Sequence, residues 1–192
     1  MDSVTATPTD RQAAICEAVF ELLGEVGYDR MSMDAIAARA HASKATIYRS
    51  WPNKPDMVMA AVVHRYGREA EAPNTGSLRG DLLAQMTAAC EIADSPDGAI
   101  VTGLMTAATR NAELSQTMHR CLYEMKHAMY EVIVARAVER GELTAGTDSG
   151  LLHEIVHSMV LARRLWGVGP LDDAFATRIV DQVLLPVLHQ GA

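Results

Sequence analysis

The apolar residues of this chain recur at steps of three and four positions, which is the spacing of one face of an α-helix. In the first run of this kind the apolar positions are Ile15, Val19, Leu22 and Val26. No segment alternates apolar and polar positions over several residues with β-branched side chains, as a half-exposed strand would. Nearly half of the residues are hydrophobic, which is enough for a folded core. The sequence therefore predicts an all-α protein.

Helix starts and stops divide the first part of the chain into short helices. Gly27 is expected to end the first helix, because glycine readily takes the conformation that closes one. Ser32 can then cap a second helix and Ser43 a third, since serine hydroxyls accept hydrogen bonds from the first amides of a helix. These helices predict a small N-terminal three-helix domain over residues 10–53, preceded by a flexible arm over residues 1–9.

A longer helical region is expected to follow. A connecting helix over residues 54–72 leads out of the small domain. Segments rich in Gly, Pro, Asp and Ser then interrupt the chain near 72–77, 94–98, 141–150 and 167–173. The longest uninterrupted stretch, from about 112 to 140, carries a continuous apolar stripe. We predict a larger helical domain over residues 73–192.

The net charge of −7 argues at first against a nucleic-acid partner, because DNA phosphates repel an acidic protein. The charge is unevenly distributed, however. Residues 1–70 contain eight Lys and Arg against nine Asp and Glu, whereas residues 71–192 contain nine against fifteen. No acidic residue lies between Asp34 and Asp56. The cations in that stretch are Arg39, Lys44, Arg49 and Lys54. The sequence thus predicts a local cationic patch on an acidic protein.

The same stretch has the spacing of a helix-turn-helix. This motif requires a small residue where its helices cross, a turn-tolerant residue four positions later and an apolar residue six positions beyond that. Ala37, His41 and Ile47 have this spacing, and Ile36 and Ala40 supply the other inward positions of the first helix. The following helix then presents small, hydroxyl and cationic side chains outward. This arrangement is typical of a DNA-binding motif.

The chemistry of DNA gives each outward residue a role. Ser43 and Lys44, with the amides at the start of their helix, can receive a phosphate. The short side chains that follow let the helix enter the major groove, and the next tyrosine and arginine can reach phosphates or a guanine edge. The lysine that opens the fourth helix can neutralise backbone charge. The predicted DNA-binding residues are Ser32, Ser43, Lys44, Ala45, Thr46, Tyr48, Arg49 and Lys54.

The stretch GYDRMSMDAIAARAHASKATIYRSWPNKPDMV, residues 27–58, resembles the signature of the TetR family of bacterial transcriptional repressors. It contains a Gly-aromatic end to the first helix, an I-A-x-x-A helix, the segment S-K-x-T-I-Y, an aromatic residue and a lysine that opens the fourth helix. One pair departs from the family pattern. The turn usually carries Gly and then a β-branched residue, whereas this chain has His41 and Ala42. Because histidine tolerates a left-handed backbone less well than glycine, we expect a slightly strained or differently shaped turn.

The resemblance implies a homodimer that places two recognition helices in successive major grooves of a palindromic, double-stranded DNA operator. It also implies that a small-molecule effector, whose identity the sequence does not reveal, binds the 73–192 domain and releases the DNA by favouring another conformer. A methionine-rich interior is typical of an adaptable apolar pocket. The predicted pocket residues are Met86, Met105, Arg110, Met118, Tyr123, Met125, Met129, Met159 and Trp166.

The last two helices carry apolar residues on more than one face, over 151–165 and 179–188. An ordinary core explains part of this pattern. One subunit can hardly cover both faces of two terminal helices, so we favour a dimer interface in which two helices from each subunit form a four-helix bundle. The predicted interface residues are Ile155, Met159, Ile179, Val183, Leu184 and Val187.

Two alternative functions stay open. His153, Glu154 and His157 fit the H-E-x-x-H pattern, in which two histidines bind zinc and the glutamate acts as general base of a hydrolase. Val160 and Arg163 stand where the Gly and His of the metzincin extension belong, and a catalytic zinc needs a third ligand. We therefore expect no metal and no enzyme activity. A helical dimer that binds only protein or ligand is the second alternative, and it leaves the four clustered cations unexplained.

The remaining features concern the cellular setting. Cys16, Cys90 and Cys121 are odd in number and form no C-x-x-C pair, so we expect reduced core residues. The first ten residues lack the cationic start and apolar middle of a secretory signal, and no apolar run approaches membrane-spanning length. The expected protein is cytoplasmic, has no membrane contact and requires no cofactor.

Overall fold

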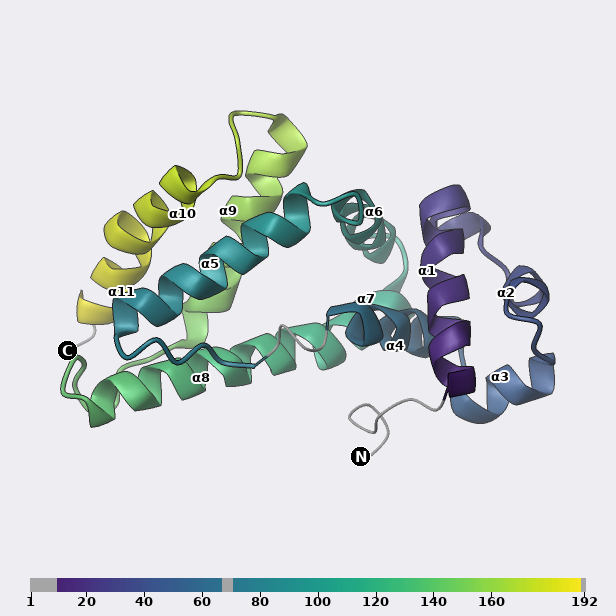
Figure 1. Cartoon of the computed structure of the whole chain (residues 1–192), viewed down its shortest axis with the longest axis horizontal. Coiled ribbons are helices and arrows are strands. Elements are labelled where there is room, and N and C mark those ends of the chain that lie inside the picture. Colours follow the sequence, from purple (N-terminus) through teal and green to yellow (C-terminus); the bar gives the residue numbers. More distant parts are fainter. Residues whose placement is uncertain (1–9, 67–70, 191–192) are drawn as a thin grey trace. The chain divides into compact units, whose positions relative to one another are not determined.

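The structure, a computed structural model, describes residues 10–66 and 71–190 and contains helices but no strand over these ranges (Figure 1). The prediction of an all-α fold is confirmed. The predicted flexible arm over residues 1–9 lies outside the described residues. No helix within the described ranges combines the length and the apolar content needed to cross a bilayer.

Two compact units divide the chain, and each is made of two separate segments. The first unit contains residues 1–69 and 99–122, and the second contains residues 70–98 and 123–192. The units therefore interleave along the sequence. The domain boundaries expected from the sequence remain predictions.

The first unit contains a set of short and medium helices: α1 (Asp10–Arg30), α2 (Met33–Arg39), α3 (Lys44–Ser50), α4 (Lys54–Tyr66), α6 (Gly98–Ala108, from its second residue) and α7 (Ala112–Met118). α1 packs against α2 and α4, α2 against α3, and α4 against α7. Enclosed apolar side chains from both chain segments form one core, among them Ile15, Val19, Met57, Val58, Leu104 and Leu114. Burial of these side chains provides the main stabilisation of the unit.

The end of α1 differs from the prediction. Gly27 has φ 73° and ψ 170°, values outside the helical region, yet helical residues continue to Arg30. Glycine takes a positive φ without the steric clash of a Cβ atom. The chain therefore kinks at Gly27 instead of ending the helix there, and the kink places Tyr28 in the core of the first unit.

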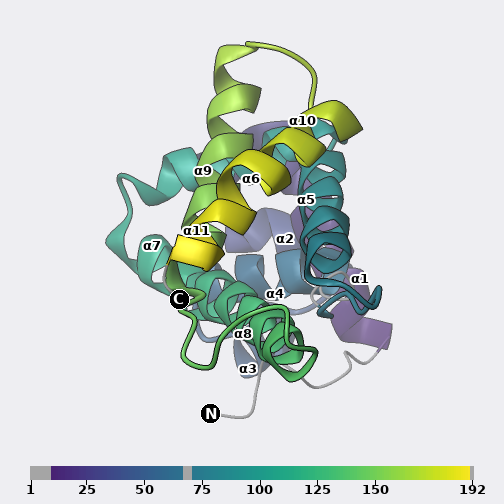
Figure 2. The same cartoon turned by 90° about the vertical axis from the view of Figure 1, so that its left-hand side faces the viewer.

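The second unit is organised around α5 (Leu78–Asp94). The other helices are α8 (Glu124–Glu139), α9 (Gly150–Trp166) and a last run made of α10 (Asp173–Ile179), η3 (Val180–Leu184) and α11 (Leu185–Gln190). α5 contacts α8, α9, α10 and η3, which makes it the central helix. Figure 2 shows the last run, in yellow, in front of α5 and α9. The enclosed side chains of the core include Leu82, Met86, Ile133, Val180, Leu184 and Leu188.

The stretch expected to be the longest helix is helical over its whole length but not uniform. α7 leads into η2 (His119–Tyr123), a π-helical turn, and α8 follows directly. A π turn accommodates one extra residue and so rotates the faces of the helix on either side of it. The apolar stripe is accordingly shared: Leu114 lies in the core of the first unit, and Met129 and Ile133 lie in the core of the second.

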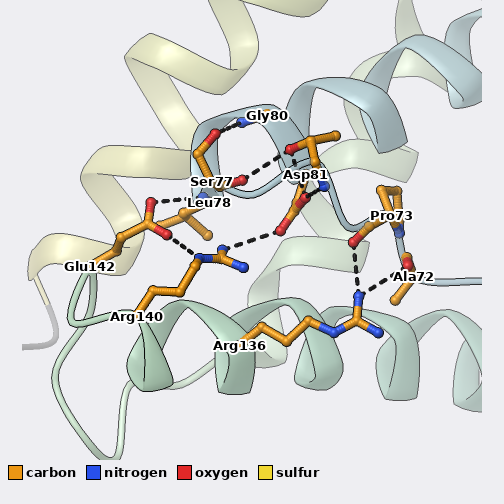
Figure 3. A network of polar contacts seen from close by, with 10 residues as sticks. Ala72, Pro73, Ser77, Leu78, Gly80, Asp81, Arg136, Arg140 and Glu142 are labelled. Carbon is orange, nitrogen blue, oxygen red and sulfur yellow. Dashed lines mark hydrogen bonds and ion pairs between the residues drawn. The ribbon is translucent and has the colours of Figure 1, made fainter.

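A polar network joins the start of α5 to the end of α8 within the second unit (Figure 3). The fully buried Asp81 carboxylate accepts hydrogen bonds from the Thr75 amide at 2.6 Å, the Thr75 hydroxyl at 2.8 Å and Arg140 at 3.2 Å. The Glu142 carboxylate accepts from Arg140 at 2.5 Å and from the Leu78 amide at 2.7 Å. These two donors, Arg140 above all, hold the pKa of Glu142 below its usual value.

Arg136 extends the same network toward the residues that precede α5. Its guanidinium donates to the backbone carbonyls of Ala72 at 3.2 Å and Pro73 at 3.0 Å (Figure 3). Arg136 thus fixes the segment before α5 to α8, and Arg140 joins the end of α8 to Asp81 in the first turn of α5. No local pattern in the sequence indicates these connections, because the contacts between the two regions join residues 59 to 64 positions apart.

Candidate nucleic-acid interface

A tight turn joins α2 to α3 in the first unit. The amide of Ala42 donates to the carbonyl of Ala37 at 2.9 Å, and the amide of His41 donates to the carbonyl of Ala38 at 3.3 Å. This pair of bonds is a Schellman motif, in which the residue just past the helix takes a left-handed conformation. His41 accordingly has φ 48°, and it is the one non-glycine residue with positive φ in the described part of the chain. A histidine thus occupies a left-handed position here.

Two isoleucines anchor the inner side of this motif. Ile36 of α2 and Ile47 of α3 have no exposed surface and lie in the core of the first unit. Ala37, the residue expected at the helix crossing, is half-buried and packs against the same core. The inner side is therefore fixed by packing, and the opposite side of α3 faces solvent.

Serine residues cap both helices, as predicted. The Ser32 hydroxyl accepts a hydrogen bond from the Ala35 amide at 3.2 Å, and the Ser43 hydroxyl accepts one from the Thr46 amide at 3.1 Å. The hydroxyls of Ser43 and Thr46 lie 2.9 Å apart and share a further hydrogen bond. Both hydroxyls at the start of α3 therefore have a partner inside the protein.

The outward side of α3 consists of Lys44, Ala45, Tyr48 and Arg49, all of which are exposed. Tyr48 exposes 48% of its surface, which is unusual for a large aromatic side chain and leaves its hydroxyl available to a partner. Thr46 is half-buried next to its cap. A helix with short side chains beside a phenol and a guanidinium can approach base edges and phosphates together.

Two of the four cations in the predicted patch are paired with acids on neighbouring helices. Arg39 donates to Glu25 of α1 at 2.8 and 3.0 Å and to Glu21 of α1 at 3.0 Å. Lys44, the first residue of α3, is ion-paired with Asp34 of α2, and this hydrogen bond raises the pKa of Lys44. The sequence therefore overstates the free positive charge, because these pairings depend on the packing of the helices.

The other two cations differ from each other. Lys54 is half-buried, donates to the Tyr28 carbonyl at 2.5 Å and lies 4.2 Å from the centre of the Tyr28 ring. Burial lowers the pKa of Lys54, and Asp29 acts in the opposite direction. Arg49 is exposed and has no ion-pair partner among the described residues. Lys54 thus fixes the start of α4 to the end of α1, whereas the Arg49 side chain is exposed to solvent.

A solvent-facing helix joined by a tight turn to a companion helix, with one fully buried isoleucine in each, is the arrangement of a helix-turn-helix DNA-binding motif. The family model described as bacterial regulatory proteins, tetR family, matches residues 15–61, and the tetracyclin repressor-like C-terminal domain matches residues 72–183. The chain belongs to the TetR family of transcriptional regulators and binds DNA through its N-terminal helix-turn-helix. The resemblance seen in residues 27–58 is confirmed.

Relatives along nearly the whole chain support this assignment. A DNA-binding transcriptional repressor, TetR, of Mycobacteroides abscessus is 39% identical over 183 residues, which cover 95% of this chain and 96% of the relative. An uncharacterized HTH-type transcriptional regulator of Mycobacterium tuberculosis is 32% identical over 190 residues, with 96% and 94% covered. Among solved structures, the TetR family transcription regulator SCO0332 has a TM-score of 0.75 and 29% identity and covers 93% of this chain and 98% of its own.

The residues predicted to form an effector pocket are distributed over both units. Those in the first unit are Met105, Arg110 and Met118, and Arg110 lies 3.6 Å from Asp29 in an exposed ion pair. In the second unit, two are enclosed in the core, Met86 and Met129. Two others are exposed, Met159 to 38% and Trp166 to 76%. The predicted set therefore combines core and surface positions.

The second unit also contains half-buried pocket residues and two buried polar side chains. Tyr123 and Met125 are half-buried, and the Tyr123 hydroxyl donates to Glu154 at 3.2 Å. Gln85 and Tyr130 are buried among apolar side chains, and burial raises the pKa of Tyr130. Neither residue is among the site residues predicted from the sequence. Polar residues at core positions of α5 and α8 were the available signal.

The predicted dimer residues occupy three environments in the second unit. Ile179 and Leu184 are enclosed in the core, and Ile155, Val183 and Val187 are half-buried. Met159 is exposed, and so are further apolar residues of α9 and the turn that follows it: Leu151, Leu165, Trp166 and Val168. A groove of about 320 Å³ lies next to them, lined in part by Met159, Ala162, Trp166, Arg178 and Val183. An apolar surface therefore exists beside α9, although two of the six predicted residues face the core.

The H-E-x-x-H segment lies within α9. The rings of His153 and His157 are 5.6 Å apart, and the Glu154 carboxylate accepts the Tyr123 hydroxyl. Burial, followed by the influence of His157 and other cations nearby, lowers the pKa of His153 to about 4, and burial lowers that of His157. Within the residues that the structure describes, no group of three His, Cys, Asp or Glu side chains is arranged to hold a metal ion.

Proposed function

We propose that this protein is a repressor that binds a palindromic operator as a homodimer in the cytoplasm, is released by a small-molecule effector, and has no catalytic role. The observation that carries the proposal is the exposed side of α3, with Tyr48 and Arg49 next to the small Ala45 on a helix anchored by a buried isoleucine. The 39% identity to a DNA-binding transcriptional repressor supports the direction of regulation.

The residues of α3 divide into two groups by their chemistry. Ser43, Lys44 and Tyr48 carry donors at the helix start and on its flank, which suits phosphate contacts that position the protein. Ala45 and Arg49 suit the groove, because a short side chain allows close approach and a guanidinium can bind a guanine edge at two points. Ser32, Thr46 and Lys54 are the remaining predicted contacts. Like Ser43 and Lys44, they already have partners inside the protein and can offer only their remaining donors or acceptors to DNA.

The division of roles can be tested by selecting bound duplexes from a random pool and then comparing variants. Recovery of a palindrome supports dimeric binding. We expect Tyr48→Phe to weaken binding on all duplexes alike and Arg49→Ala to change the preferred base at one position of each half-site, at a cost of about 1–3 kcal/mol on the selected operator. Arg164→Ala, which removes an exposed arginine from the second unit, is the matched control. Failure of the purified protein to bind any duplex at low salt would refute the DNA-binding role.

The dimer is proposed to form through the exposed apolar side of α9. Leu151, Met159, Leu165 and Trp166 contribute little to the stability of the monomer, because large parts of their side chains are exposed, and together they give α9 an exposed apolar side. A bundle with the same helices of a second copy would bury this surface. Met159→Glu should shift the protein toward monomer in sedimentation, whereas Val132→Glu, at an exposed position of α8, should leave the dimer intact.

The effector is proposed to bind in the second unit. Met125 and Tyr123 are half-buried beside core methionines, and methionine side chains adapt to ligands of different shape. A true effector should raise the melting temperature and weaken operator binding, and the operator should weaken effector binding by the same factor. A compound that stabilises the protein without this reciprocity is not the effector.

A further inference from the structure

The first residue of the recognition helix has an acidic partner within the protein. The Lys44 ammonium, at the start of α3, is ion-paired with the carboxylate of Asp34 in the first turn of α2. Both side chains are largely in solvent, with exposed fractions of 54% for Lys44 and 71% for Asp34. An ion pair in this setting is weak and can exchange its partner readily.

The Lys44 pair differs from the other ion pair of this region. Arg39 makes two hydrogen bonds to one carboxylate of α1 and a third to another, which is the geometry of a structural connection between helices. Lys44 makes a single-point contact to a residue at the solvent-exposed start of the neighbouring helix. Asp34 also lies two residues after Ser32, at the start of α2, where a DNA backbone is expected.

We propose that Asp34 lowers the affinity of this protein for DNA by holding Lys44 and by presenting a negative charge beside the phosphate that Lys44 would bind. Carboxylate and phosphate are both anions, so they compete for one ammonium. The free protein uses the carboxylate, and the bound protein has to transfer or share the ammonium. This inference rests on the proposed DNA contact of Lys44.

The proposal predicts tighter binding when the carboxylate is removed. Asp34→Asn should increase affinity roughly two- to fivefold at low salt, which is the range of one exposed ion pair. The increase should be similar on the selected operator and on an unrelated duplex, because phosphates carry no sequence information. The logarithm of affinity should also fall more steeply with the logarithm of salt, by up to about one, because an ammonium that the carboxylate no longer shares displaces a full counterion.

The experiment measures binding of the full-length chain to both duplexes by fluorescence anisotropy over a range of salt. Asp34→Asn is compared with Glu113→Gln, which makes the same change in net charge at an exposed position of α7 in the same unit. Lys44→Met is made alone and together with Asp34→Asn. In the Lys44→Met background, the gain from Asp34→Asn should be smaller, because only the direct repulsion between the Asp34 carboxylate and the phosphate remains to be removed.

The outcomes separate the two levels of the proposal. If wild type and all variants leave every duplex unbound, the DNA-binding function itself fails. If wild type binds but Asp34→Asn binds no more tightly than Glu113→Gln, only the role of Asp34 is overturned. The same holds if the gain is undiminished without Lys44. Asp34→Glu should bind as wild type does, and melting curves of each variant show whether α2 has stayed folded, since an acid in the first turn also favours the helix.

Discussion

His41 occupies a backbone position that a glycine occupies elsewhere in this chain. At the end of α8, Gly141 has φ 77° and the same pair of bonds, from Gly141 to Val138 at 3.0 Å and from Glu142 to Ala137 at 2.9 Å. The end of α2 repeats this arrangement with a residue that has a Cβ atom. Comparison of His41 with Gly141 therefore indicates the energetic cost of a side chain at a left-handed backbone position.

His41→Gly should stabilise the first unit by about 0.5–1 kcal/mol, because relief of the left-handed penalty exceeds the added entropy of the unfolded glycine. Gly141→Ala should destabilise the second unit by about 1 kcal/mol for the opposite reason. Urea unfolding followed by hydrogen exchange of the amides in each unit measures both. An unchanged or less stable His41→Gly variant would show that the imidazole makes a compensating contact.

The lowered pKa of His153 predicts how the stability of the protein depends on pH. Its pKa is lowered to about 4 from an ordinary value of 6.5, so below pH 6.5 the unfolded chain binds a proton that the folded chain excludes. The groups that face it are His157 on its own helix and Lys126, His127 and Tyr123 from the neighbouring segment. The free energy of unfolding should be at its full value above pH 6.5 and should fall as pH decreases toward 4.

The comparison of wild type with His153→Gln isolates this effect. The glutamine variant should show a flatter decline between pH 6.5 and 5 in urea unfolding. Acids with lowered pKa values, such as Glu142, lose their stabilising effect only as pH falls below their ordinary value of 4.5, so they do not contribute in this window. Equal slopes for the two proteins would mean that His153 is protonated in the folded state.

At the scale of single residues, local chemistry was predictable and pairing was not. The caps at Ser32 and Ser43 follow from a bond between near neighbours, and the structure contains both. The pairing of Arg39 with Glu21 and Glu25, and of Lys54 with the Tyr28 carbonyl, joins residues that come together only after the helices pack. A count of charges along the sequence therefore identified the cationic patch but not the ion pairs that neutralise two of its four cations.

Helices show the same contrast. The periodicity of 112–140 predicted one helix, and the chain is helical there, but the π turn at η2 divides its stripe between two cores. An extra residue within a helix leaves no clear mark in a three- and four-residue pattern. At Gly27 the sequence predicted a helix end where the chain has only a kink, because a glycine that can end a helix can also kink one that continues.

The connection between α5 and α8 yields a prediction for two arginines of the second unit. Arg140 is paired with Asp81, which has no exposed surface, whereas Arg79 is paired with Asp181 in the open, where both side chains are largely exposed. Arg140→Met leaves a buried carboxylate without its cation and should destabilise the second unit by about 3 kcal/mol. Arg79→Met should cost less than about 1 kcal/mol. Chemical denaturation of both variants tests this, and equal losses would contradict the buried role of Asp81.

At the scale of the whole molecule, the fluorescence of Trp166 should report on dimer assembly. Trp51 is half-buried in the first unit, and Trp166 exposes 76% of its surface at the end of α9. In a Trp51→Phe variant, the emission of Trp166 should move to longer wavelength as the protein is diluted, because separation of the proposed dimer returns the indole to water. Emission that stays constant, while sedimentation shows dissociation, would place Trp166 outside the interface.

The fold class and the position of the DNA-binding motif followed from periodicity, caps and spacing, all of which are local. The dimer surface followed only in part, because both enclosed and exposed apolar residues of a terminal helix satisfy the same pattern. Leu184 and Leu165 are equally apolar, yet one is enclosed and the other exposes 56% of its surface. Which face turns inward depends on the helices that pack against it.

The interleaving of the two units limits how proteins of this design can be recombined. Leu104 and Leu114 share a core with Met57 and Val58, although residues 70–98, which belong to the other unit, lie between them along the chain. A fragment that stops near residue 70 would lack Leu104, Ala107 and Leu114, would expose the core side chains that they cover, and should behave as a loosely packed, aggregation-prone species. Exchange of the second unit between such regulators therefore cannot proceed by a single crossover at that point, and a viable hybrid has to carry residues 99–122 together with the helix-turn-helix.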